Sequence, residues 1–116
     1  MTMRAVLAVV PVAEIEKAVQ WYEGFFGRAA DTRPMDSLAE WHLSELGVVQ
    51  VFEDPGRAGR TAVNLTVDDL DATLSTLSGQ GIASSDAQVV SGGRQRLAVV
   101  QDPDGNQLGL IESLTT

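Results

Sequence analysis

The sequence contains no cysteine and only one histidine among its 116 residues. The absence of cysteine excludes disulfide bonds, thiolate metal ligands and a cysteine nucleophile. The longest mostly apolar run, residues 5–13, contains Pro11 and is too short to cross a bilayer. It also lacks the cleavage site of an export signal. We therefore expect a soluble, cytoplasmic protein that does not bind membranes.

Basic residues are also scarce, because eight Lys and Arg residues face sixteen Asp and Glu residues, for a net charge of -8. Nucleic-acid phosphates are bound by clustered Lys and Arg side chains, so this balance predicts no nucleic-acid partner. An acidic surface favours cationic small molecules, although acidity also serves solubility alone. A hydrophobic content of 44% is that of an ordinary globular protein rather than a disordered one.

The first half of the chain has the pattern of a buried strand followed by an amphipathic helix. Residues 4–10 form an apolar run rich in β-branched residues, and we expect Pro11 to end this strand. Gly27 is placed to end the helix with a positive φ angle. Between them the apolar residues recur at helical spacing, at Ile15, Ala18, Val19, Tyr22 and Phe26.

The second half repeats this pattern at an offset of 55 residues, which aligns Leu7 with Ala62. Residues 61–67 predict a strand, and Asp68 or Asp69 can cap the helix that follows. Short strands are expected after each helix, at about residues 28–34, 38–44 and 48–53, and then at 85–90, 94–101 and 107–112. Residues 102–106, with the sequence DPDGN, predict a tight turn. The pattern indicates an α+β fold of two β-α-β-β-β modules, over about residues 3–55 and 60–114.

Three segments carry a resemblance to a known family: VVPVAEIEKAVQWYEGFFG, VNLTVDDLDATLSTLSGQGI and QDPDGNQLGLIE. In this order they resemble the glyoxalase/bleomycin-resistance/extradiol-dioxygenase superfamily, also called vicinal oxygen chelate proteins. The resemblance covers nearly the whole chain and implies one domain over residues 1–116, with mixed sheets that curl around a cavity. It also implies a homodimer. The alternative is an unrelated α+β sandwich of the ferredoxin type.

Enzymes of this superfamily hold a divalent metal through His, Glu or Gln side chains at four strand positions. The resemblance places those positions at Leu7, Gln50, Ala62 and Gly109, of which only Gln50 offers a donor atom. Divalent cations need several oxygen or nitrogen ligands. We therefore expect no metal site of the family type and no cofactor.

Two glutamates lie near the lost positions. Glu53 and Glu112 each follow an expected ligand position by three residues. Because strand side chains alternate between faces, this odd offset directs both carboxylates away from the cavity unless a bulge intervenes. The single histidine, His42, is not at a family ligand position.

Alternation along the strands predicts a mostly apolar pocket with a few polar groups. The candidate ligand-binding residues are Trp41, Gln50, Phe52, Asn64, Thr66 and Arg96. A two-residue turn at 46–47 would place Trp41 opposite Phe52 on the pocket wall, whereas a three-residue turn would place His42 opposite Gln50. We favour Trp41 in the pocket, and the alternative is a tryptophan in the core or at a dimer interface. Arg94 or Arg96 could meet an anionic ligand group, although such arginines are commonly solvated.

The function that these features favour is a metal-free protein that sequesters a planar or cationic drug-like ligand, such as an antibiotic, in a dimeric cleft. The alternative is a lyase, isomerase or dioxygenase-like enzyme of the same superfamily, for which His42 is the sole acid–base candidate near neutral pH. A third possibility is an accessory module whose pocket has no remaining role.

Overall fold

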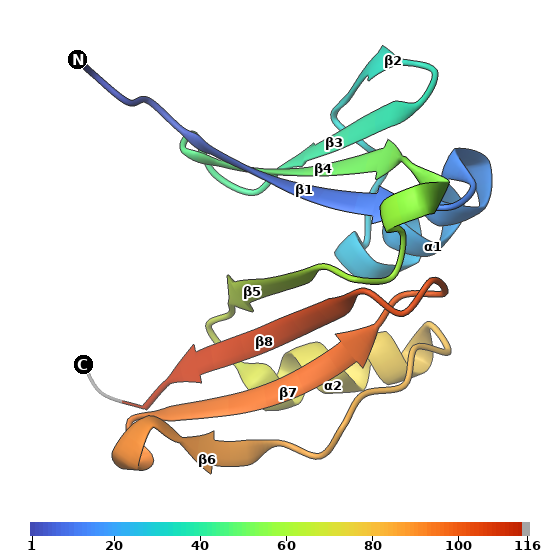
Figure 1. The fold of residues 1–116 in the computed structure, drawn as a ribbon. Helices are drawn as coiled ribbons and strands as arrows, with labels where there is room; N and C mark the ends of the chain where they lie inside the picture. Colours follow the sequence, from blue (N-terminus) through green and yellow to red (C-terminus); the bar gives the residue numbers. More distant parts are fainter. Residues whose placement is uncertain (115–116) are drawn as a thin grey trace.

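The computed structural model describes residues 1–114, and within them the chain forms two four-stranded sheets, each with one helix (Figure 1). Each half has the order β-α-β-β-β, so the predicted α+β fold is confirmed. The elements of the first half are β1 (Val6–Val12), α1 (Ile15–Phe26), β2 (Thr32–Met35), β3 (Leu38–His42) and β4 (Gly47–Glu53). Those of the second half are β5 (Ala62–Thr66), α2 (Leu70–Gly79), β6 (Gln88–Val90), β7 (Gln95–Gln101) and β8 (Gln107–Ser113).

The two sheets have equivalent topologies, with strand orders β1-β4-β3-β2 and β5-β8-β7-β6. The parallel pairs are β1 with β4 and β5 with β8, the first and last strands of each module along the chain. The remaining neighbouring strands are antiparallel. No helix within residues 1–114 has the length and apolar character needed to cross a membrane.

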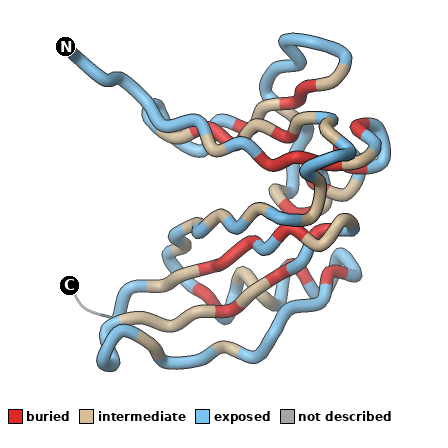
Figure 2. The backbone as a smooth tube through the Cα atoms, in the orientation of Figure 1, coloured by how far each residue is buried: buried red, intermediate tan, exposed pale blue. Residues whose placement is uncertain are grey.

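The apolar stripes of both helices pack on the sheets. In α1 the buried residues are Ile15, Ala18, Val19, Tyr22 and Phe25, and in α2 they are Leu70 and Leu77. These side chains and the helix-facing side chains of both sheets form one continuous hydrophobic cluster. Figure 2 shows buried stretches in both halves of the chain, while the amino-terminal segment and most loops are exposed.

Both helices begin at a carboxylate supplied by the last strand of their own module. Glu53 of β4 accepts a 2.9 Å hydrogen bond from the Ile15 amide, and Glu112 of β8 accepts one of 2.8 Å from the Leu70 amide. Asp69 adds a side-chain cap to α2 through the amide of Ala72. A negative charge at a helix amino terminus satisfies free amides and complements the helix dipole. The two glutamates therefore point to the helix side of each sheet, as strand alternation predicts.

The expected end of the first strand at Pro11 is wrong, because β1 continues through Pro11 to Val12. Proline is tolerated here since β1 is the edge strand of its sheet, where a missing amide need not break the ladder. The carbonyl of Pro11 accepts a 2.8 Å hydrogen bond from the side-chain amide of Asn106.

The turn at residues 102–106 links the two modules. Asp102 is 4% exposed, and one of its oxygens accepts hydrogen bonds from the Tyr22 hydroxyl and the Asn106 side-chain amide, both at 2.7 Å. Its other oxygen accepts the backbone amides of Asp104 and Asn106 at 2.9 Å. The carboxylate that shapes the turn of module 2 thus also holds a side chain of α1 in module 1.

Tyr22, the single tyrosine of the chain, is expected to make the protein less stable at alkaline pH. Burial, and then the Asp102 charge, raise the pKa of its phenol well above the ordinary value of about 10. The unfolded chain releases this proton at about pH 10 whereas the folded chain keeps it. We therefore expect the free energy of unfolding to fall as the pH rises above about 10, as measured by denaturant titrations from about pH 8 to pH 11.

Replacing Tyr22 with Phe should reduce that alkaline decline and destabilise the protein near neutral pH by about 1–3 kcal/mol, because a hydrogen bond to a buried charge is lost. Thr66→Val, which removes an exposed hydroxyl, is the control and should change stability by less than about 0.5 kcal/mol. An equally steep alkaline decline in the wild type and in Tyr22→Phe would contradict this assignment.

Candidate functional site

Each sheet has one side covered by helices and one side without a helix, which we call its open face. Strand alternation separates the two sides, since Val10, Val49 and Val51 are buried on the helix side whereas Leu7 and Val9 are exposed. The open face of module 1 consists of Leu7, Val9, Leu38, Glu40, His42, Val48, Gln50 and Phe52. The open face of module 2 consists of Ala62, Asn64, Thr66, Leu97, Val99, Gln107, Gly109 and Ile111.

Trp41 does not lie on the open face, which corrects the preference for Trp41 over His42. The connection between β3 and β4 spans residues 43–46, longer than either turn considered, and it pairs Trp41 with Val49. Trp41 is completely buried, packs against Phe26 with ring centres 5.2 Å apart, and donates its indole N–H to the carbonyl of Arg28. Its role is in the core, and the open face carries His42 instead.

A polar cluster lies on the open face of module 1 between apolar side chains. Glu40 accepts a 2.7 Å hydrogen bond from the side-chain amide of Gln50 and a 2.8 Å hydrogen bond from the hydroxyl of Thr32. The Nε2 atom of His42 lies 3.5 Å from Oε1 of Glu40, the same oxygen that accepts from Thr32. The hydrogen bonds from Gln50 and Thr32 lower the pKa of Glu40, so this carboxylate is charged at neutral pH.

Sequence reasoning missed Glu40. The missing signal was the strand register: once β3 and β4 are aligned, Glu40 lies directly opposite Gln50, and His42 is two residues further on the same face. With the four-residue connection at 43–46 known, alternation alone would have placed all three side chains together.

On the open face of module 2, Asn64 lies directly opposite Gly109. A Cβ atom at position 109 would collide with the side-chain oxygen of Asn64, so the amide of Asn64 occupies the space beside the glycine. Thr66 lies opposite Ile111 in the neighbouring row. This face therefore combines amide and hydroxyl groups with apolar side chains and carries no charged side chain among the residues defined above.

Arg96, expected to reach a ligand, lies on the helix side of the second sheet. It pairs with Glu112 in the β7–β8 register, and its guanidinium donates a 2.9 Å hydrogen bond to Asp71 of α2. The same guanidinium lies 4.0 Å from the carboxylate of Glu112. Arg96 therefore neutralises acidic side chains around the start of α2 and is absent from the open face.

The four positions that the resemblance assigns to the metal do not offer a ligand set for a divalent cation. Leu7, Ala62 and Gly109 have no donor atom, and the amide nitrogen of Gln50 is bonded to Glu40. Within residues 1–114, no three side chains of His, Cys, Asp or Glu are grouped so that they could hold a metal ion. The residues present do not fit the metal of the family enzymes.

The open faces of one chain do not form a common cavity. The helix sides of both sheets share one hydrophobic cluster, and α1 lies between the two sheets (Figure 1), so the open faces point outward. Gln50 and Phe52 on one sheet are thus separated from Asn64 and Thr66 on the other. A cleft that uses all four residues requires more than one copy of the chain.

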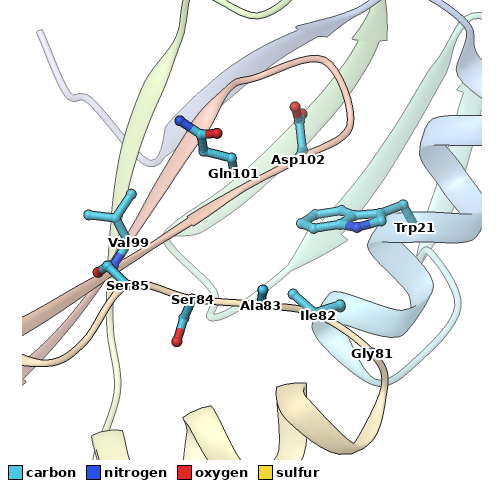
Figure 3. A pocket seen from close by; sticks show the side chains of 9 residues that line it. All are labelled: Trp21, Gly81, Ile82, Ala83, Ser84, Ser85, Val99, Gln101 and Asp102. Carbon is cyan, nitrogen blue, oxygen red and sulfur yellow. The ribbon is translucent and has the colours of Figure 1, made fainter.

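A separate cavity of about 500 Å³ lies between α1, β7 and the loop after α2 (Figure 3). The Trp21 indole forms one wall and stacks on Phe25 with ring centres 5.4 Å apart. The opposite side carries Val99 and Gln101, and the loop contributes small residues such as Ala83 and Ser84. Asp102, which borders this cavity, already has its hydrogen-bonding capacity committed to the module junction.

Comparison with known proteins identifies the family. A model of the glyoxalase-like domain matches residues 7–111, most of the chain. The chain belongs to this family. The glyoxalase/bleomycin resistance protein from Catenulispora acidiphila DSM 44928 is similar at 30% identity and a TM-score of 0.86, over 95% of this chain and 98% of that protein.

Two further structures share the fold of this glyoxalase-like domain. They are the antibiotic-binding protein TnmS3 from Streptomyces sp. CB03234 and a bleomycin-binding protein complexed with bleomycin. The first has 24% identity and a TM-score of 0.78, covering 97% of both chains. The second has 22% identity and a TM-score of 0.77, covering 97% of this chain and 99% of that one. No curated protein matches the sequence. The predicted membership of the glyoxalase/bleomycin-resistance/dioxygenase superfamily is confirmed.

The contact between Gly109 and Asn64 can be tested by a double-mutant cycle. We expect Gly109→Ala to destabilise the protein by about 1–3 kcal/mol, because the new methyl group overlaps the Asn64 amide. Asn64→Ala should remove most of this cost when combined with Gly109→Ala. Denaturant unfolding of the wild type, both single variants and the double variant measures the coupling. Strictly additive effects would show that Asn64 does not fill this space.

Proposed function

We propose that this protein is a metal-free small-molecule-binding protein that sequesters an antibiotic or another drug-like ligand in a cleft between two copies of the chain. The observation that carries the proposal is the open face of module 1. It presents Leu7, Val9 and Phe52 around a few fixed polar groups, the usual composition of a small-molecule site. The family metal positions around it supply one potential donor, so binding rather than metal-assisted catalysis fits this face.

The exposed apolar residues support a homodimer. Leu7 is 53% exposed and Val9 is 42% exposed, and both lie on the open face of β1. Clustered exposed apolar side chains mark binding or association surfaces. In a two-fold symmetric dimer, the open face of module 1 in one copy can lie against the open face of module 2 in the other. The cleft would then contain Gln50 and Phe52 from one copy, with Asn64 and Thr66 from its partner.

The names of similar structures agree with this ligand class. One is named an antibiotic-binding protein and another a bleomycin-binding protein in complex with bleomycin. Bleomycin is therefore the first compound to test for binding to this chain. The proposal does not require that bleomycin be the natural ligand.

A second candidate function, an enzyme of the lyase, isomerase or dioxygenase type, is favoured by one observation. His42 is exposed on the open face and its Nε2 atom lies 3.5 Å from Glu40. A histidine beside a carboxylate can act as a general base toward a bound ligand. In this case His42 would be the catalytic base, without help from a metal.

Binding can be tested by thermal unfolding. We expect bleomycin to raise the Tm by several degrees, since a ligand at a hundredfold excess over its Kd adds about 2.7 kcal/mol of stability. Elemental analysis of the purified protein should find no stoichiometric divalent metal, and added zinc, nickel or manganese should leave the Tm unchanged. Bleomycin recovered chemically unchanged supports sequestration. A product whose formation is lost in His42→Gln would instead support the enzyme, and a stoichiometric bound metal would contradict the metal-free proposal.

Mixing two variants tests whether the cleft joins two copies. Phe52→Ala changes the face of module 1 and Thr66→Lys changes the face of module 2, so each homodimer should lose binding at both of its sites. Heterodimers made by co-refolding should regain one intact site, because the unaltered face of each copy then meets the other. Isothermal titration should recover up to about half a site per chain in those heterodimers. If each site lay within one chain, mixing would restore no binding.

A further inference from the structure

Glu40 is a carboxylate without a permanent positive partner on an otherwise largely apolar face. Its side chain is 15% exposed. Within residues 1–114, no Lys or Arg forms an ion pair with it, and the nearest ionisable group is the ring of His42 at 3.5 Å. The row of Glu40 also carries Val9 on β1, and the next row carries Phe52 on β4.

The hydrogen bonds around Glu40 hold it in its charged form without neutralising it. Gln50 and Thr32 are neutral donors, and each bonds to a different carboxylate oxygen. A partly buried charge is normally paired, because removing it from water is costly. Two arginines of the same module are engaged elsewhere, because Arg28 pairs with Asp31 and Arg33 pairs with Glu16. A cationic ligand on this face would supply the permanent counter-charge that no Lys or Arg within residues 1–114 provides.

We propose that Glu40 is the anchor that selects positively charged ligands on the open face of module 1. This inference rests on the proposed binding function and specifies the ligand class of the same site. Gln50 and Thr32 fix the direction of the carboxylate, so the residue is ready to meet a cation before the ligand arrives. A preoriented partner reduces the ordering cost of binding.

The position of Phe52, one row away from Glu40, indicates the shape of the ligand. Phe52 and Gln50 are two residues apart on the same face of β4, and Gln50 lies opposite Glu40. Two residues along a strand span about 6.6 Å. A ligand that stacks an aromatic ring on Phe52 therefore needs a system of two or three fused rings to reach the carboxylate of Glu40. The ligand class is a planar aromatic cation, such as an aminoacridinium or a protonated amino-heteroaromatic compound.

Proflavine and acridone provide a matched pair of probes, because both are tricyclic and only proflavine is charged at neutral pH. We expect the wild type to bind proflavine at least about tenfold more tightly than acridone in fluorescence titrations. Glu40→Gln should weaken proflavine binding by about tenfold and leave acridone binding unchanged. The variant keeps the size of the side chain and can still accept from Gln50 and donate to a rotated Thr32 hydroxyl, but it loses the charge.

Two further variants make the result specific to this carboxylate. Glu23→Gln removes the same charge from the exposed face of α1 and controls for the overall acidity of the chain; it should not affect either probe. His42→Lys places a fixed cation beside Glu40 at an exposed position, and it should weaken proflavine binding even if Glu40→Gln proves unstable.

The possible outcomes separate the two proposals. Equal losses of proflavine affinity in Glu40→Gln and Glu23→Gln would overturn the anchor and leave small-molecule binding intact. The anchor would also be overturned, with small-molecule binding intact, if the wild type binds proflavine and acridone equally and neither Glu40→Gln nor His42→Lys changes the two affinities. If the wild type binds neither probe nor bleomycin, both the anchor and the binding function are wrong.

Discussion

The arrangement of the two modules depends on the hydrogen bonds that the buried carboxylate of Asp102 accepts. This carboxylate accepts hydrogen bonds from the Tyr22 hydroxyl and from the side-chain and backbone amides of Asn106, in addition to the amide of Asp104. Asn106 then reaches the carbonyl of Pro11 in β1. Because buried polar groups are costly unless they are bonded, these contacts favour one relative position of the modules. The short DPDGN turn is therefore both a local turn and the junction of the fold.

The relative position of the modules determines which faces of the sheets are left exposed. With the helix sides turned inward around α1, the open faces are left outside, and neither can be closed by the other face of the same chain. A cleft lined by both open faces would therefore need a second copy of the chain. The chemistry of each face is then set by strand register, which on module 1 brings a charged carboxylate, an imidazole and an amide together and leaves the tryptophan in the core.

Features that depend on local sequence could be predicted. The helical stripes, the cap at Asp69, the left-handed end at Gly27 and the helix-side direction of Glu53 all follow from spacing and residue type. Features that depend on pairing between strands could not. The length of the β3–β4 connection decides whether Trp41 or His42 faces outward, because one residue of slip reverses every side chain. Glu40 was missed and Arg96 was assigned to the wrong face for the same reason. The face on which each side chain lies depends on how its strand pairs with the neighbouring strand.

Two of the positions that the resemblance assigns to the metal, 50 and 109, make other contacts in this chain and are integrated into its packing. At position 109 the space beside the glycine is filled by Asn64, so a glutamate there would have to displace that amide. At position 50 a glutamate in place of Gln50 would bring a second negative charge against Glu40, now 2.7 Å from the amide nitrogen. Like charges at this distance strongly oppose ionisation of both groups. Introducing a glutamate at either position alone would therefore disturb the packing or the charge balance of the face.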